Sequence, residues 1–212
     1  MSRMPEKKVI GLTGTIGSGK STALRILSEY MPASDCDQIT ASLLKPRNPG
    51  YEALKEHGLL ITDINGNLDR KKTAAKLFSD PEYKKKYEGI LHPLILQAMN
   101  DWIDEQDTSC VVEVPLLFEL GLQDDFDETW MISASPDSAL KRTEKNRNIS
   151  RNEQLERRSF QMPDEKKAEL ADVRILNDGT LADLKSRLCE LFSERVLSDP
   201  DGTNKTDCRQ AA

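Results

Sequence analysis

A short glycine-rich segment near the N-terminus constrains this chain more than any other feature. Residues 14–21, Gly-Thr-Ile-Gly-Ser-Gly-Lys-Ser, satisfy the pattern G-x-x-x-x-G-K-[ST]. An apolar run at 8–13 precedes the segment, and Leu24 and Leu27 follow it at helical spacing, which predicts a strand, a loop and a helix in that order. Glycines let successive N–H groups turn toward phosphate oxygens, and the helix adds the positive end of its dipole. The segment therefore predicts an α/β fold with a site for nucleotide phosphates.

The residue types of this loop each suit one task in phosphate binding. We expect Lys20 to reach the β- and γ-phosphates and the Ser21 hydroxyl to ligate Mg²⁺. The residues expected to bind the nucleotide here are Gly14, Gly17, Ser18, Gly19, Lys20, Ser21 and Thr22.

Further strands are predicted at 109–117, where Pro115 ends the strand, at 128–134 and at 173–176, each an apolar run. A weaker strand is predicted in 31–37. Strands that alternate with helices indicate parallel βαβ units, whose ligands bind at the carboxyl ends of the strands. Thr180 and Asp183 begin a last amphipathic helix in the manner of a capping box.

The chain of 212 residues is predicted to form one domain over 1–197. Within that domain we expect a helical insertion at about 38–105 and a lid at about 138–165. The polar segment 198–212 is expected to be disordered.

Composition excludes several classes of protein. A net charge of −6 argues against a broad nucleic-acid interface, and the absence of a signal peptide or a long apolar run favours the cytoplasm. The cysteines lack metal-site spacing, and we expect all of them to be free thiols: Cys36, Cys110, Cys189 and Cys208. We expect a monomer or a weak homo-oligomer.

A phosphate loop alone does not separate a GTPase switch from a kinase. Asp63-Ile64-Asn65-Gly66 matches D-x-x-G, and residues 204–207, Asn-Lys-Thr-Asp, match the guanine-reading N-K-x-D. A guanine-reading motif must follow a strand, but 204–207 lies in a polar tail. The first string is better explained by a solvated Asn-Gly turn, so we favour a kinase.

A kinase needs a group that orients or deprotonates the acceptor, and cations for the transferring phosphoryl group. Asp35 and Asp37 follow the weaker strand, and Asp35 is our candidate base, although a helix cap would explain it equally well. A basic stretch supplies a candidate lid, although a solvated helix face remains an alternative; its cations are Lys141, Arg142, Lys145, Arg147, Arg151, Arg157 and Arg158.

Four further residues are candidates from spacing alone. His92 precedes a proline and suits packing better than catalysis. Glu113 ends a predicted strand and could hold Mg²⁺ through water, or could simply be buried with a partner. Asn177 and Gly179, after the last strand, are where we expect the adenine to be read.

From about residue 9 to 195 the chain resembles the dephospho-coenzyme A kinase family. The markers occur in the family's order: IGLTGTIGSGKST (10–22), DCD (35–37), LDR (68–70), LHPLI (91–95), VPLLFE (114–119), LKRTEKNR (140–147), RRSFQMP (157–163) and ADVRILNDG (171–179). The phosphate loop is common to many kinases, whereas LHP followed by VPLLFE and R-x-x-x-Q is far more specific.

The resemblance implies a P-loop fold, with a parallel five-stranded sheet flanked by helices, and transfer of the γ-phosphoryl group of ATP to the 3′-hydroxyl of dephospho-CoA. It implies that Mg²⁺ is needed, that Asp35, Lys20 and Arg142 are catalytic, and that Arg142 and Arg147 bind ATP from the lid. The helical insertion would bind the CoA moiety, and the implied substrate-binding residues are Asp35, Arg70, His92, Pro93, Leu116 and Glu119.

Overall fold

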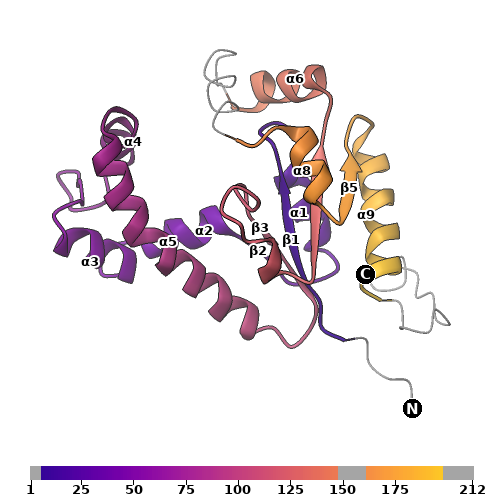
Figure 1. The fold of residues 1–212 in the computed structure, drawn as a ribbon, viewed down its shortest axis with the longest axis horizontal. Coiled ribbons are helices and arrows are strands. Elements are labelled where there is room, and N and C mark those ends of the chain that lie inside the picture. Colours follow the sequence, from indigo (N-terminus) through magenta and orange to yellow (C-terminus); the bar gives the residue numbers. More distant parts are fainter. Residues whose placement is uncertain (1–5, 148–160, 198–212) are drawn as a thin grey trace. The chain divides into compact units, whose positions relative to one another are not determined.

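The computed structural model describes residues 6–147 and 161–197, without the side chains of 141 and 143–147. Its backbone contacts divide the chain into two compact units. One combines the residues up to Ser34 with those from Gln106 onward, and the other is Asp35–Glu105. The first unit carries the sheet, and the second is helical (Figure 1).

The sheet has five strands in the order β2-β3-β1-β4-β5 (Figure 1). The central strand β1 runs parallel to β3 and β4, with Ile10 opposite Val111 and Leu12 opposite Trp130. These strands are buried along nearly their whole length, as expected for a parallel sheet that is covered on both faces. The strands are β1 Val9–Gly14, β2 Ala33–Asp35, β3 Cys110–Glu113, β4 Glu128–Ser133 and β5 Val173–Leu176. The predicted five-stranded parallel sheet is confirmed.

Two helices, α1 (Lys20–Leu27) and α9 (Leu181–Arg195), contribute to the hydrophobic core with the sheet. Leu27 and Leu188 are fully buried in one cluster with side chains from four of the strands. The predicted capping box at the start of α9 is confirmed, because Thr180 and Asp183 exchange hydrogen bonds. Together these contacts hold α1, and the loop before it, on the sheet.

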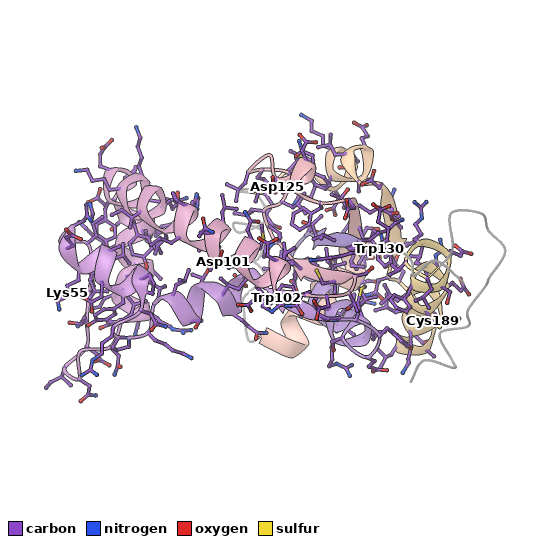
Figure 2. All side chains as sticks on the ribbon, turned by 90° about the horizontal axis from the view of Figure 1, so that it is seen from below. Lys55, Asp101, Trp102, Asp125, Trp130 and Cys189 are labelled. Atoms are coloured by element: carbon purple, nitrogen blue, oxygen red, sulfur yellow. The ribbon has the colours of Figure 1, made fainter. Side chains whose placement is uncertain are left out.

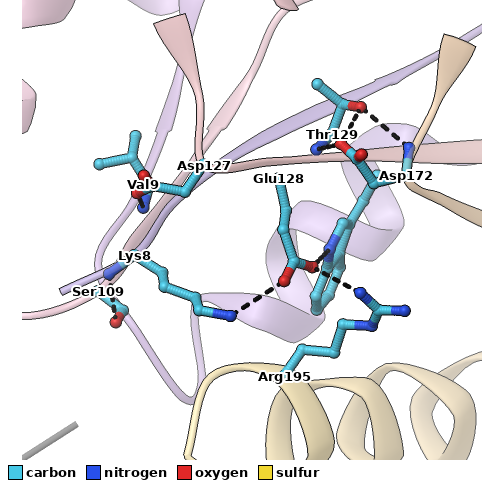
Figure 3. A network of polar contacts seen from close by, with 9 residues as sticks. Lys8, Val9, Ser109, Asp127, Glu128, Thr129, Asp172 and Arg195 are labelled. Carbon is cyan, nitrogen blue, oxygen red and sulfur yellow. Dashed lines mark hydrogen bonds and ion pairs between the residues drawn. The ribbon is translucent and has the colours of Figure 1, made fainter. Parts of the chain in front are cut away.

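A network of polar contacts includes Glu128, Lys8 and Arg195 (Figure 3). Trp130 is fully buried, and its Nε1–H donates to Glu128 at 3.1 Å. Glu128 also pairs with Lys8 at 3.0 Å and with Arg195 at 3.5 Å. Lys8 and Arg195 are half-exposed, so their ion pairs add little stability by themselves. The Glu128 carboxylate, however, satisfies the one polar atom of Trp130, the largest fully buried side chain.

The helical unit consists of α2 (Cys36–Leu43), α3 (Pro49–Glu56), α4 (Arg70–Ser79) and α5 (Pro81–Asp104). The other three helices all pack against α5. Leu54, Tyr87 and Leu91 form its buried cluster. Burial raises the pKa of Tyr87 to about 12, and the neighbouring Tyr83 adds to the shift.

The D-x-x-G string lies in this helical unit and forms a turn. Asp63 accepts hydrogen bonds from the backbone N–H groups of Asn65 and Asn67, each at 2.9 Å. Ile64 is fully exposed, and a bridge between Thr62 and Leu68 closes the turn. The interpretation as a solvated Asn-Gly turn is confirmed. Residues 204–207 lie outside the described residues.

The strand predicted within 109–117 ends at Glu113, before Pro115 as expected. Val114 still donates to Leu12 in ladder fashion at 2.9 Å. Pro115 then has no N–H to donate, so the ladder cannot continue. The chain turns instead, and Leu117 and Phe118 are buried from a loop.

The prediction of four free thiols is wrong for Cys189 of α9, labelled in Figure 2, which is disulfide-bonded. Cys36 and Cys110 are not disulfide-bonded, and Cys208 lies outside the described residues. Burial raises the pKa of the Cys110 thiol. None of the described helices is long and apolar enough to cross a membrane.

Candidate active site

The phosphate loop joins β1 to α1 and depends on two glycines. Gly14 has φ 148° and Gly19 has φ 100°, values that L-residues with side chains rarely adopt. A Cβ at Gly14 would lie 2.2 Å from the carbonyl oxygen of Ile132, and one at Gly19 would lie 2.4 Å from Nδ2 of Asn177. Both positions exclude side chains for reasons of conformation and of space. Thr15, by contrast, does not have a positive φ.

Lys20 begins α1 and turns its side chain back across the loop. Its Nζ donates to the carbonyl of Thr15 at 3.0 Å, and the backbone N–H of Ser18 donates to the same carbonyl at 3.2 Å. The Thr15 carbonyl therefore holds the loop in a tight turn with the ammonium group beside it. Ser21 is exposed and Thr22 half-buried in the first turn of the helix.

The backbone of Ser18 is held from two distant parts of the chain. Asn177, which follows β5 and is buried, donates to the Ser18 carbonyl at 2.8 Å. Arg142 of α6 (Pro136–Arg147) approaches the same carbonyl and Oδ1 of Asn177, each at 3.5 Å. The structure thus brings two of the predicted nucleotide-binding residues to the phosphate loop.

Asp178 and Gly179 follow Asn177 at the same end of the sheet. Asp178 accepts a hydrogen bond of 2.8 Å from the backbone N–H of Ser135, and this bond is the main cause that lowers the pKa of Asp178. A Cβ at Gly179 would lie 2.6 Å from the capping carboxylate of Asp183. The expected part of Gly179 in nucleotide binding stays a prediction.

Glu113 is the last residue of β3 and is 5% exposed. Glu113 lies opposite Leu12 of β1 in the parallel register. Leu12 is two residues before Gly14, the first glycine of the loop. Both strands therefore deliver their carboxyl ends to the same edge of the sheet, where a parallel α/β fold binds its ligands.

The loop after β3 holds two residues that we expected to bind substrate. Leu116 is 38% exposed. Glu119 pairs with Lys167 at 2.8 Å and accepts from the backbone N–H of Met162 at 2.7 Å. Spacing gave no sign of Lys167 or of these contacts.

The other candidates belong to the helical unit. Asp35 ends β2 and caps α2, accepting a hydrogen bond of 2.7 Å from the backbone N–H of Asp37. The cap that we weighed as the alternative is therefore present, and the role as base stays a prediction. Arg70 is the first residue of α4, and His92 and Pro93 lie within α5, where Arg70 and Pro93 are exposed and His92 is half-buried.

Part of the predicted lid lies outside the described residues. Arg147 is the last residue of α6, and its side chain is outside the described part of the chain. The side chains of Lys141 and Lys145, and residues Arg151, Arg157 and Arg158, are outside it too.

The glycine loop joins a central parallel strand to a helix that begins with Lys20, and Arg142 of α6 contacts the loop. This arrangement is the phosphate site of a P-loop kinase. The profile of the family described as Dephospho-CoA kinase matches residues 8–183. The chain belongs to the dephospho-CoA kinase family.

Individual relatives agree with this assignment. The chain is 34% identical to Dephospho-CoA kinase of Carboxydothermus hydrogenoformans, over 90% of this chain and 96% of the relative. A solved Thermus thermophilus structure is 32% identical with a TM-score of 0.77, covering 90% of this chain and 98% of that one. The Dephospho-CoA kinase structure from Campylobacter jejuni is 25% identical with a TM-score of 0.66, covering 90% and 98%. The shikimate kinase of Acinetobacter baumannii, 17% identical with a TM-score of 0.51 over 92% of this chain and 97% of that one, shares the fold.

Proposed function

We propose that this chain phosphorylates the 3′-hydroxyl of the ribose of dephospho-CoA with ATP, giving CoA and ADP. The hydroxyl oxygen attacks the γ-phosphorus, and the bond from that phosphorus to the β-phosphate oxygen breaks, so ADP leaves with the electron pair. The hydroxyl proton passes to the carboxylate of Asp35. Lys20 and Arg142 balance the negative charge that develops on the phosphoryl oxygens.

The observation that carries this proposal is the phosphate loop with its two cations. Lys20 lies 3.0 Å from the Thr15 carbonyl and Arg142 3.5 Å from that of Ser18, so both cationic groups lie at the loop backbone. Arginine stays charged at any working pH and can grip two phosphate oxygens at once. A loop of N–H donors with these side chains supports transfer of a phosphoryl group.

The residues present fit a magnesium ion. Ser21 presents its hydroxyl at the exposed first turn of α1, and Glu113 ends the strand beside β1. Hydroxyl, carboxylate and phosphate oxygens are the ligands that Mg²⁺ prefers. Ser21 would hold the ion directly and Glu113 through water, and the ion would neutralise phosphate charge.

The substrate side of the proposal concerns the helical unit. Arg70, His92 and Pro93, together with Leu116 and Glu119, bind dephospho-CoA. The exposed guanidinium of Arg70 at the start of α4 suits an anionic group of the substrate. Arg147 joins Arg142 in binding ATP, and Asn177 and Gly179 line the adenine side.

A coupled assay that measures ADP tests the function. Purified protein receives ATP, Mg²⁺ and dephospho-CoA, and an acceptor-free reaction serves as the control. We expect ADP in equal amount to CoA, with the new phosphate on the 3′-oxygen by ³¹P NMR. ADP formation no faster than in the acceptor-free reaction would refute the proposal. Shikimate and a nucleoside as acceptors test the alternative, another metabolite or nucleoside kinase of this fold.

We propose the cytoplasm, which supplies ATP, as the location, and a monomer or weak homo-oligomer as the state. Cell fractionation tests the location, and thiol trapping in the same fractions measures the redox state of Cys189. Light scattering during size-exclusion chromatography measures the oligomeric state.

A further inference from the structure

A buried ion pair lies between the loop after β3 and helix α8 (Asp164–Leu170). Lys167 of α8 is fully buried, and its Nζ lies 2.8 Å from Oε1 of Glu119 and 3.4 Å from the carbonyl oxygen of Pro115. A buried ammonium is costly unless it is paired and hydrogen-bonded, and its geometry is correspondingly fixed. Glu119 therefore has a defined position.

Glu119 also fixes the segment before α8 by a hydrogen bond. The backbone N–H of Met162 donates to the same Oε1 atom at 2.7 Å. The preceding residue, Gln161, reaches the phosphate loop, where its Oε1 accepts the backbone N–H of Ile16 at 3.2 Å. Gln161 is the last residue of the R-x-x-x-Q marker, to which no role has been given so far.

The peptide group that Gln161 contacts also contacts Lys20. The N–H of Ile16 and the C=O of Thr15 belong to one peptide, which is planar, so holding the N–H fixes the direction of the carbonyl. That carbonyl accepts Nζ of Lys20 at 3.0 Å. A chain of contacts thus runs from Lys167 through Glu119, Met162 and Gln161 to this peptide.

We propose that Gln161 is a positioning residue for phosphoryl transfer: it orients the Thr15–Ile16 peptide and with it the Lys20 ammonium group, and the Lys167–Glu119 pair holds Gln161 in place. The proposal rests on the phosphoryl transfer proposed above, because the ammonium acts on the transferring group. An amide suits the task, since it offers a neutral acceptor to the N–H and adds no negative charge beside the phosphates.

Gln161→Leu tests the acceptor, because leucine keeps most of the bulk and removes the oxygen. Loss of one neutral hydrogen bond predicts amide exchange at Ile16 faster by about 3- to 10-fold in the free enzyme. We expect kcat to fall by a similar factor while KM for dephospho-CoA is unchanged, and Tm to stay within about 2 °C because Gln161 is half-exposed.

Gln161→Glu is the conservative variant. Its carboxylate restores an acceptor, so Ile16 should exchange as slowly as in the wild type, whereas ATP binding should weaken by charge repulsion. Gln123→Leu is the matched control, since the Gln123 side chain makes no hydrogen bond among the described residues. It should change neither Ile16 exchange nor kcat.

Lys167→Met tests whether the Lys167–Glu119 pair holds Gln161 in place. It should lower Tm and speed Ile16 exchange, and combining it with Gln161→Leu should add nothing further to that exchange, because both act on one contact. Unchanged Ile16 exchange or unchanged kcat in Gln161→Leu would overturn the proposal, as would additive effects in the double variant. Exchange needs no substrate, so it decides the role of Gln161 at the loop even if the wild type failed to phosphorylate dephospho-CoA.

Discussion

The side-chain amide of Asn177 donates a 2.8 Å hydrogen bond to the backbone carbonyl of Ser18, 159 positions earlier in the chain. The end of β5 thereby holds the phosphate loop at Ser18, whereas Gln161 contacts it at Ile16. The same amide nitrogen lies where a side chain at Gly19 would begin. The loop is therefore shaped by residues that the glycine motif does not contain.

Gly19→Ala should disable the loop. The new Cβ would lie 2.4 Å from Nδ2 of Asn177, at a backbone φ of 100°. We expect a loss of about 1–3 kcal/mol in unfolding free energy and ATP affinity at least about 10-fold weaker, which calorimetric titration measures. Gly58→Ala is the control, since Gly58 has φ 66° with open space around its Cβ. It should cost about 1 kcal/mol and leave ATP binding intact. Equal ATP affinity in both variants would contradict this account.

Asp35→Asn separates the proposed base from the helix cap. Asparagine caps helices about as well as aspartate, so the hydrogen bond from Asp37 and the stability should persist. Turnover should fall by at least about 100-fold, the typical effect of a lost general base, with ATP binding unchanged. Asp80→Asn at the α5 cap, which accepts from Tyr83 at 2.9 Å, is the matched control and should keep full activity. Near-normal turnover of Asp35→Asn would remove Asp35 from the mechanism.

Asp172, drawn with its hydrogen bonds in Figure 3, should make the unfolding free energy of the protein depend on pH. Partial burial raises the pKa of Asp172, but hydrogen bonds from the N–H and hydroxyl of Thr129, both 2.7 Å, outweigh it and lower the pKa below its ordinary value of 3.8. The unfolded chain therefore binds the proton more readily, so this contribution is fully present well above pH 4 and is lost as the pH falls toward the folded pKa.

Urea unfolding between pH 3 and 7 measures this contribution. Asp172→Asn should be less stable than the wild type by about 0.5–1.5 kcal/mol at pH 7, the net worth of hydrogen bonds, and the difference should shrink below about pH 4. Thr129→Val removes the hydroxyl, which donates to the Asp172 carboxylate and accepts from the Asp172 backbone N–H at 3.1 Å, but keeps the Thr129 backbone donor. It should therefore reduce the pH-dependent part of the stability without abolishing it. A difference that does not vary with pH would contradict the assignment.

Gly89→Ala should stabilise the protein. Gly89 lies exposed within α5 and a Cβ there would have no atom within 4 Å. Alanine in a helix interior is favoured over glycine by about 0.5–1 kcal/mol, which predicts a Tm higher by about 1–4 °C in calorimetry. Gly66→Ala, at φ 79° in the turn, also meets open space and should lower Tm instead. A lower Tm for Gly89→Ala would contradict the open space around a Cβ at this position of α5.

Sequence patterns predicted those features that depend on interactions between residues close together in the chain. The phosphate loop, the strands before and after it and the capping box at Thr180 all depend on residues a few positions apart, and all are found as predicted. Pro115, which has no N–H for the ladder, indicated the end of β3 in the sequence, and the strand ends just before it at Glu113. The Cys189 disulfide was missed because pairing depends on distance in space.

The sequence by itself predicted a site for nucleotide phosphates from the glycine loop and the lysine at the helix start, and the order of its markers pointed to the family that the comparisons established. Only the tertiary structure decided what holds that loop. Asn177 and Gln161 contact it from more than a hundred residues away, and the Lys167–Glu119 pair holds the segment beside Gln161. Such contacts form only when the parallel sheet brings the ends of its strands to one edge, and spacing along the chain carries no trace of them.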